Sequence, residues 1–135
     1  MPVARILGNR PKCQGPNTIN VQFKFFPAGN SGTTPLTVAG DRKMVSSVVR
    51  NGTAGEFLVT MADAYRNVMI TPSLQLAAAA DQKMQVGTVS NENTGTPLTF
   101  VLRCLAVAAA SEIAADANNV VHVLLTAIDS TAEEV

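Results

Sequence analysis

The chain has 135 residues and a formal net charge of zero, and only 15% of its residues are charged, against about 25% in a typical soluble domain. Nucleic acid is not an expected partner, because the chain lacks the positive excess that supplies most nucleic-acid affinity. No stretch reaches the roughly 18 apolar residues of a membrane span, and the first residues lack the apolar core of a signal peptide.

The low charge has a consequence for assembly. By size scaling, a compact monomer of this mass exposes about 6,700 Å² of surface. Ten basic and ten acidic side chains are spread thinly over such an area, so small polar and aliphatic groups must cover the rest. A surface of this kind favours permanent contact with other chains. We therefore expect a homo-oligomer, a dimer or a trimer, with a slight preference for the dimer.

Residues 1–18, "MPVARILGNRPKCQGPNT", predict an extended N-terminal arm, because prolines at 2, 11 and 16 favour extended backbone and no core periodicity is present. An extended segment can add a strand to a sheet edge or lie in a groove of a neighbouring subunit. Basic heads can pair with acidic groups there while aliphatic side chains fill an apolar site. The predicted partner-binding residues of the arm are Arg5, Ile6, Leu7, Arg10 and Lys12.

Residues 19–130 predict one domain of seven or eight strands, followed by a short tail at 131–135. The segment "INVQFKFF" (19–26) alternates apolar and polar residues, as a half-buried strand does. Asn-Gly at 51–52 and "NENTG" at 91–95 mark turns. Further strand patterns occur within 36–43, 44–50, 56–61, 67–77, 82–90, 96–107 and 120–128. The expected fold is all-β, an antiparallel β-sandwich or a jelly-roll-like barrel.

Three features refine this expectation. Pro72 cannot donate to a ladder, so its strand should lie at a sheet edge or carry a bulge. The alanine-rich segment 106–119 is compatible with a loop or with one to two helical turns, and the loop is favoured. The strands "EFLVTM" and "VVHVLLTAI" are apolar on both faces, which implies a second covering layer such as another subunit.

The sequence indicates no catalytic, metal or cofactor site. His122 is the only histidine, and no nucleophile or phosphate-binding motif accompanies it. Asp116 with Asn118 and Asn119 is the one weak candidate for metal ligation, and turn chemistry accounts for it better. The two cysteines, at 13 and 104, lack CxxC spacing and are expected to be unpaired and mostly buried.

Asp63 and Tyr65 lie together at a bend between two strand patterns, in "MADAYRN". The Asp63 carboxylate can accept a hydrogen bond from a nearby backbone N–H. The Tyr65 ring can pack at a sheet corner while its hydroxyl reaches the backbone. We interpret the pair as a structural corner and expect Tyr65→Phe or Asp63→Asn to lower the free energy of unfolding by about 1 kcal/mol.

Residues 45–130 also resemble small structural proteins that are encoded beside the major capsid protein in tailed-bacteriophage genomes. The resemblance rests on the run Gly55, Phe57, Val59, Thr60, Asp63 and Tyr65. It rests further on an Ala-Asp-Ala-Asn-Asn segment before a final strand that ends in Asp129 and Ser130. The first 40 residues contribute nothing to it.

The resemblance implies a decoration, or cement, protein on the outer surface of a phage capsid. Such proteins are commonly all-β, often jelly-roll-like, and bind the major capsid protein as dimers or trimers at the junctions between capsomers. The expected location is therefore the virion, and no enzymatic activity is expected. The alternative is a carbohydrate-binding or host-attachment module of a phage virion, since sandwiches also serve as lectins. The absence of tryptophan and the single tyrosine count against this alternative.

Overall fold

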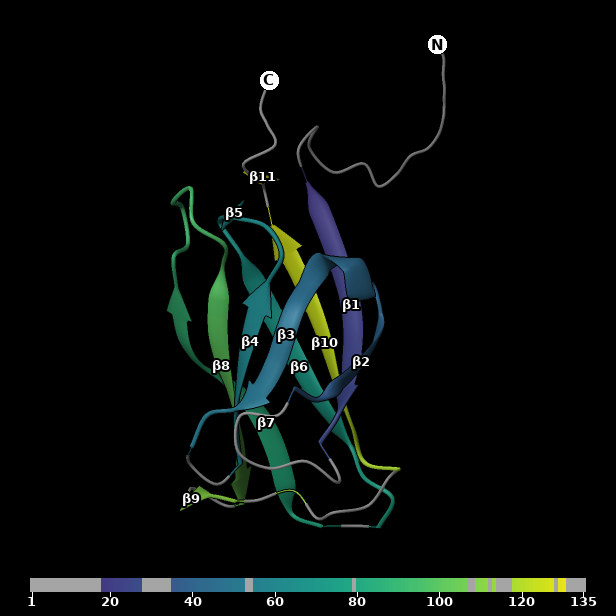
Figure 1. Cartoon of the computed structure of the whole chain (residues 1–135). Helices are drawn as coiled ribbons and strands as arrows, with labels where there is room; N and C mark the ends of the chain where they lie inside the picture. Colours follow the sequence, from purple (N-terminus) through teal and green to yellow (C-terminus); the bar gives the residue numbers. More distant parts are fainter. Residues whose placement is uncertain are drawn as a thin grey trace.

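A computed structural model of the chain describes residues 18–27, 35–52, 55–78, 80–106, 109–111, 113, 118–127 and 129–130. These residues form two antiparallel sheets packed together, so the all-β sandwich expected from the sequence is confirmed (Figure 1). The partner-binding residues predicted in the arm, the tail at 131–135, Cys13 and Asp116 lie outside the described residues.

Sheet A has the strand order β2-β1-β10-β6. Its strands are β2 (Thr37–Gly40), β1 (Ile19–Phe26), β10 (Val120–Ala127) and β6 (Met69–Gln75). Sheet B has the order β3-β4-β8-β7, with strands β3 (Val45–Arg50), β4 (Glu56–Met61), β8 (Thr99–Ala106) and β7 (Gln82–Ser90). The short strand β9 (Ala109–Ala110) also pairs with β8, and a third, two-stranded sheet joins β5 (Tyr65–Arg66) to β11 (Asp129–Ser130). A single 3₁₀ turn, η1 (Arg42–Met44), precedes β3.

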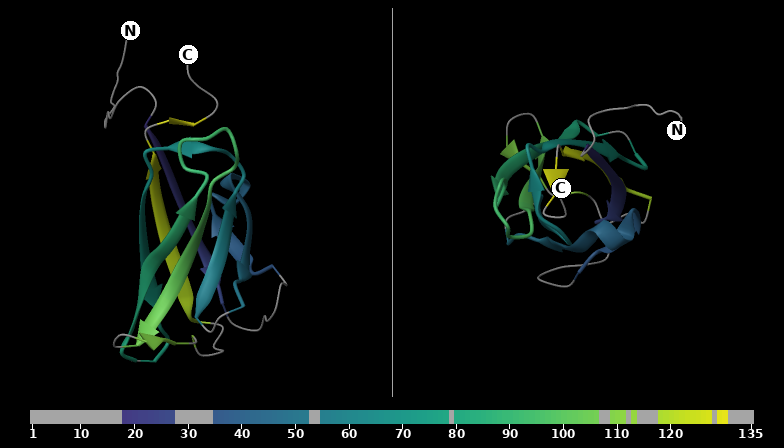
Figure 2. Two further views of the ribbon diagram at one scale, coloured as in Figure 1. Left: turned by 90° about the vertical axis from the view of Figure 1, so that its left-hand side faces the viewer. Right: turned by 90° about the horizontal axis from the view of Figure 1, so that it is seen from above.

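The strand order defines a Greek key. Strands β6, β7 and β8 follow one another along the chain and around the sandwich, and β10 returns to pair with β6 on its other side. Seen from above, the two sheets surround one interior (Figure 2). β1 begins and β10 ends at the same end of the sandwich, since Ile19 pairs with Ala127, and β5 and β11 lie across this end (upper in Figure 1).

Alternating side chains of both sheets fill the core. In β1, Val21, Phe23 and Phe25 are buried, whereas the intervening Gln22 is exposed. In β8, Phe100, Leu102 and Cys104 are buried together with the preceding Leu98. The remaining large buried side chains include Val48, Phe57, Val59, Met61, Tyr65, Val121, Val123 and Leu125.

The topology also bears on the Pro72 strand, the segment 106–119 and the two strands that are apolar on both faces. β6, which contains Pro72, is the outer strand of sheet A, so the predicted edge position is confirmed. In the segment 106–119, the described residues include no helix, and Ala109–Ala110 form the short strand β9. Of the two strands that are apolar on both faces, β10 exposes Leu124 and β4 leaves Leu58 half-buried on the outside of the sandwich.

Gly55 is held between two strands at the lower end of sheet B. Its carbonyl accepts a hydrogen bond from the backbone N–H of Cys104 at 2.7 Å, and the Cys104 carbonyl accepts one from Ser111 at 2.9 Å. Gly55 has φ +76, and a Cβ there would overlap the Ser111 carbonyl oxygen. Only glycine therefore fits this position, both for backbone conformation and for space.

We predict that Gly55→Ala lowers the free energy of unfolding by about 3 kcal/mol or more, since left-handed strain and backbone overlap add. Gly52→Ala is the matched control, because Gly52 has φ +82 but nothing within 4 Å of the added Cβ. The control should cost only about 1 kcal/mol. Chemical denaturation of both variants measures the difference, and equal losses would contradict the close packing at Gly55.

Candidate interaction surfaces

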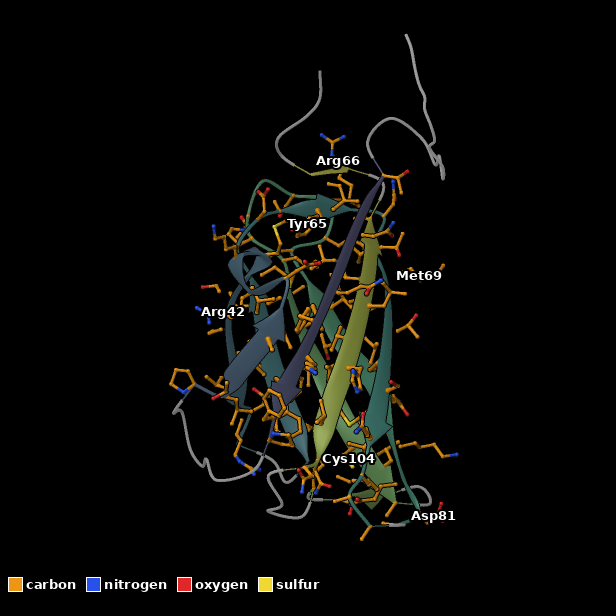
Figure 3. The ribbon with its side chains drawn as sticks, turned by 90° about the vertical axis from the view of Figure 1, so that its right-hand side faces the viewer. Arg42, Tyr65, Arg66, Met69, Asp81 and Cys104 are labelled. Atoms are coloured by element: carbon orange, nitrogen blue, oxygen red, sulfur yellow. The ribbon has the colours of Figure 1, made fainter. Side chains whose placement is uncertain are left out.

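Asp63 and Tyr65 form a corner at the upper end of the sandwich. The Asp63 carboxylate accepts a hydrogen bond from the backbone N–H of Ala64 at 2.8 Å, as expected, and the Asp63 carbonyl accepts one from Leu98 at 3.1 Å. The Tyr65 side chain is 1% exposed and belongs to the core. Figure 3 shows Tyr65 beneath the strand pair at this end of the molecule.

The expected bond from the Tyr65 hydroxyl to the backbone is not formed. The hydroxyl oxygen is buried and has no hydrogen-bond partner among the described residues. Burial raises the pKa of the Tyr65 hydroxyl above its ordinary value of 10.0, and the negative charge of Asp63 raises it further. The buried phenol stays protonated, so Tyr65 stabilises the fold through the packing of its ring.

The loop between β7 and β8 supports the corner from outside. Asn93 donates its backbone N–H to the Tyr65 carbonyl at 3.1 Å, and its side-chain oxygen accepts from the N–H of Asn67 at 3.1 Å. The Glu92 carboxylate accepts from the N–H of Val68 at 2.8 Å. The described non-glycine residues with positive φ are all asparagines, at 67, 91 and 93, which tolerate the left-handed conformation that these turns require.

A polar recess of about 500 Å³ lies between this loop and β5. Its lining comes from Ala64, Tyr65, Arg66, Asn93, Thr94 and Gly95. The Tyr65 hydroxyl is shielded from solvent, so it is not available to a ligand in the recess. Within the described ranges, no three His, Cys, Asp or Glu side chains come together in a way that could hold a metal ion.

His122 and Asn119 have structural surroundings. His122 points outward from β10, and its Nε2 lies 2.9 Å from Oε1 of Gln75 on the neighbouring strand β6. Asn119 is 2% exposed, and its side-chain oxygen accepts a hydrogen bond from the N–H of Ala77 at 2.8 Å. Asn119 therefore ties the connection after β6 to the start of β10 through a bond between residues far apart in the sequence.

The outer surface of sheet A, called the sheet A face below, is nearly free of charge. Lys24 is the one charged side chain among the outward-facing residues of the four strands, and the exposed Asp41 after β2 borders the face, where its carboxylate accepts a hydrogen bond from the backbone N–H of Gln22 at 2.8 Å. Met69, 70% exposed, and Leu124, 38% exposed, are the exposed large hydrophobic residues of the described chain, and both lie on this face. Figure 3 shows Met69 at the side of the molecule. The outward-facing residues are Asn20, Gln22, Lys24, Phe26, Thr37, Ala39, Met69, Thr71, Ser73, Gln75, His122, Leu124 and Thr126.

The outer surface of sheet B, called the sheet B face below, consists of side-chain rows that cross the strands. One row carries only hydroxyl groups: Ser47, Thr60, Thr99 and Ser90 are successive cross-strand neighbours. The next row is aliphatic and joins Val49, Leu58 and Val101. Such like-to-like rows stabilise a sheet through cross-strand contacts and present a surface of low charge.

An ion pair interrupts the sheet B face at one point. Glu56 Oε2 lies 3.2 Å from Arg103 Nε, and the Arg103 side chain is 39% exposed. The geometry of the Nε–H group towards Glu56 does not form a hydrogen bond, so the contact is an ion pair only. A shallow depression of about 320 Å³ adjoins the pair where Gly87 lacks a side chain. The pair compensates its own charges, and the exposed Lys83, opposite Leu105, adds one positive charge to this face.

Comparisons with protein-family models, with curated proteins and with solved structures found no match. The described residues include no helix with the length and hydropathy needed to cross a bilayer.

Sequence reasoning identified the corner but not the two faces. The strand alternation already separates Asn20, Gln22 and Lys24 from the core side of β1. That β1 lies beside β10, and β10 beside β6, follows only from the topology, because these strands are far apart in the chain. The alternation in each strand therefore indicated which residues face outward, but the order of the strands in sheet A could not be predicted from it.

We predict that Tyr65→Phe leaves the free energy of unfolding unchanged or raises it by up to about 1 kcal/mol, since it removes a buried hydroxyl that has no partner. This corrects the modest loss expected from the sequence. Tyr65→Ala is the control and should cost about 3–5 kcal/mol through the cavity it leaves. A clear loss of stability in Tyr65→Phe, measured by chemical denaturation, would show that the hydroxyl is bonded after all.

The raised pKa of Tyr65 predicts a loss of stability at high pH. The folded chain keeps the phenol proton at a pH where the unfolded chain has begun to release it, so this contribution is complete below pH 10.0 and falls as the pH rises above that value. The chain has one tyrosine and no tryptophan, so phenolate absorbance reports this group alone. We expect the phenol of the folded chain to titrate with a midpoint above pH 10.0. Asp63→Asn should lower this midpoint, and unfolding in denaturant should return it to the ordinary value. A native midpoint at or below 10.0 would contradict the burial of the hydroxyl.

Proposed function

We propose that this chain is a structural protein that binds other subunits through the outer surfaces of its sheets. The observation that carries the proposal is the sheet A face, which spans four strands, carries one charged side chain among the described residues and exposes Met69 and Leu124. Charged groups are depleted at the centres of protein interfaces, whereas exposed apolar side chains are costly to leave in water. The proposal assigns no catalytic step and no cofactor.

We further propose the particular role of a capsid cement protein of a tailed phage. The support for this step is the resemblance of residues 45–130 to structural proteins encoded beside major capsid proteins, together with the neutral composition of the chain. In this role the protein binds the outer surface of the head where capsomers meet and holds them together. The virion and the major capsid protein are its proposed location and partner.

Distributed burial of surface accounts for how such a protein stabilises a shell. An interface of standard size buries about 1,600 Å² and gives affinities from micromolar to picomolar, depending on packing. Many copies on a symmetric shell, each contacting more than one capsomer, multiply the effect because one contact raises the effective concentration of the next. A rigid sandwich suits the task, since little conformational entropy is lost on binding.

The burial of the aromatic rings counts further against the carbohydrate-binding alternative. The chain contains five phenylalanines and one tyrosine, and all six lie in the described part. Five of them are buried, and Phe26 is half-buried beside Lys24 on the sheet A face. A sugar site with a stacked ring needs an exposed aromatic face. A glycan array that shows specific binding would restore this alternative.

We predict that deletion of residues 1–16 leaves the melting temperature nearly unchanged, because β1 begins at Ile19 and every described strand remains. If the arm binds a partner, the same deletion should weaken binding to capsids stripped of the protein by about tenfold or more, which is about 1.4 kcal/mol. Co-sedimentation with the stripped capsids measures the affinity, and thermal unfolding measures the stability.

A charge-neutral variant of the arm, with Arg5, Arg10 and Lys12 replaced by serine, separates charge from length. We expect it to lose part of the affinity and to make the remaining binding less dependent on salt, since the basic heads are proposed to pair with acidic groups. Unchanged capsid binding after deletion would make the arm passive, and unfolding after deletion would place it in the core. Absence of any binding by the intact chain would contradict the proposed cement role itself.

A further inference from the structure

We infer that the sheet A face binds the same face of a second copy of this chain, so that the protein forms a two-fold dimer. The inference deepens the proposed function, because it assigns one of the two broad faces to self-association and leaves the sheet B face and the sandwich ends for other partners. Self-association is measured without any capsid, so it stands or fails separately from the cement role.

The first argument is a contiguous apolar patch. Met69 pairs in register with Thr126, and Leu124 pairs with Thr71 on the same two strands. Met69 and Leu124 are therefore diagonal neighbours on one face of the β6–β10 pair, close enough for long side chains to touch. Together they expose more large apolar surface than any other place among the described residues. Removal of this patch from water is favourable in proportion to its area.

The second argument is that two pairs of polar side chains around the patch are already hydrogen-bonded to each other. The Thr126 hydroxyl donates to the Asn20 side-chain oxygen at 3.0 Å, and His122 Nε2 lies 2.9 Å from Gln75 Oε1. Burial of a polar group is costly when its hydrogen bond to water is lost without replacement. Here the replacement exists within each copy, so an interface can cover these groups without supplying a partner for each one.

The low charge of the sheet A face favours a second copy of the chain as its partner. A partner with a highly charged surface would bury its charges against a face that offers only Lys24 and, at its edge, Asp41 in return. A second copy brings the same neutral face and adds no other charge. Lys24 lies towards the lower half of the face, opposite His122, with its Nζ 6.0 Å from the centre of the Phe26 ring, whereas the apolar patch lies towards the upper end. In a two-fold arrangement centred near the patch, Met69 and Leu124 meet their own copies, as a self-complementary interface requires.

The size of the face sets the strength of the expected dimer. Four strands of four to eight residues, spaced about 4.8 Å apart and rising about 3.4 Å per residue, cover roughly 450 Å². Two such faces bury roughly 900 Å² or somewhat more, which is at the lower limit for a specific interface. We therefore expect a reversible dimer whose population changes over the micromolar range.

Sedimentation equilibrium of the full chain, between about 1 µM and about 1 mM, tests the inference. The wild type should dimerise reversibly, and Met69→Lys and Leu124→Lys should each weaken the dimer by about tenfold or more, because each buries an unpaired charge. Ser90→Lys is the matched control: it adds the same charge at an exposed position of an edge strand on the sheet B face. The control should dimerise like the wild type.

Each outcome has one meaning. Met69 is 70% exposed, so Met69→Lys should fold normally and decides the matter even if Leu124→Lys does not fold. A wild type that remains monomeric over the whole range overturns the inference, including the case in which the chain's own arm covers the face. A dimer weakened by Ser90→Lys but not by Met69→Lys also overturns it. A monomeric protein that still binds capsids would leave the proposed function intact.

Discussion

The packing of two sheets against each other is the constraint on which the rest of the structure depends. Towards the lower end of this interior the rings of Phe25, from sheet A, and Phe57, from sheet B, lie 5.2 Å apart at an interplanar angle of 57°, a tilted contact that aromatic pairs favour. Every long strand contributes alternate side chains to this interior. The alternation that fills the core therefore also determines which side chains face outward, and those side chains are available for partners.

The long strands were predictable because alternation and turn residues act locally. The sequence predicted strands at 19–26 and 82–90, and β1 and β7 have these bounds. The two-residue strands β5, β9 and β11 carry no periodicity of their own, since each depends on a neighbour that tertiary packing supplies. The fate of the Tyr65 hydroxyl was predicted wrongly for a related reason: sequence can place a ring at a corner but cannot position the acceptor that the hydroxyl needs.

Composition predicted that the chain has interaction surfaces, and topology determines where they lie. A charge content of 15% predicted that the chain meets other chains, without saying where. The location depends on the Greek key, which brings β1, β10 and β6 together from distant parts of the sequence. Only then do Asn20, Thr126 and Met69 lie side by side in one row. The corner around Asp63 and Tyr65 has a different role, since it closes the upper end of the sandwich and is hydrogen-bonded to the β7–β8 loop.

A cryo-EM map of the particles produced by the genome that encodes this chain tests the central claim most directly. The account predicts density for the sandwich on the outside of the capsid shell, at junctions between capsomers. It predicts pairs of sandwiches that meet through the faces built by β2, β1, β10 and β6. Particles whose shell lacks this density, or which carry the chain only on a tail fibre or inside the head, would contradict the account.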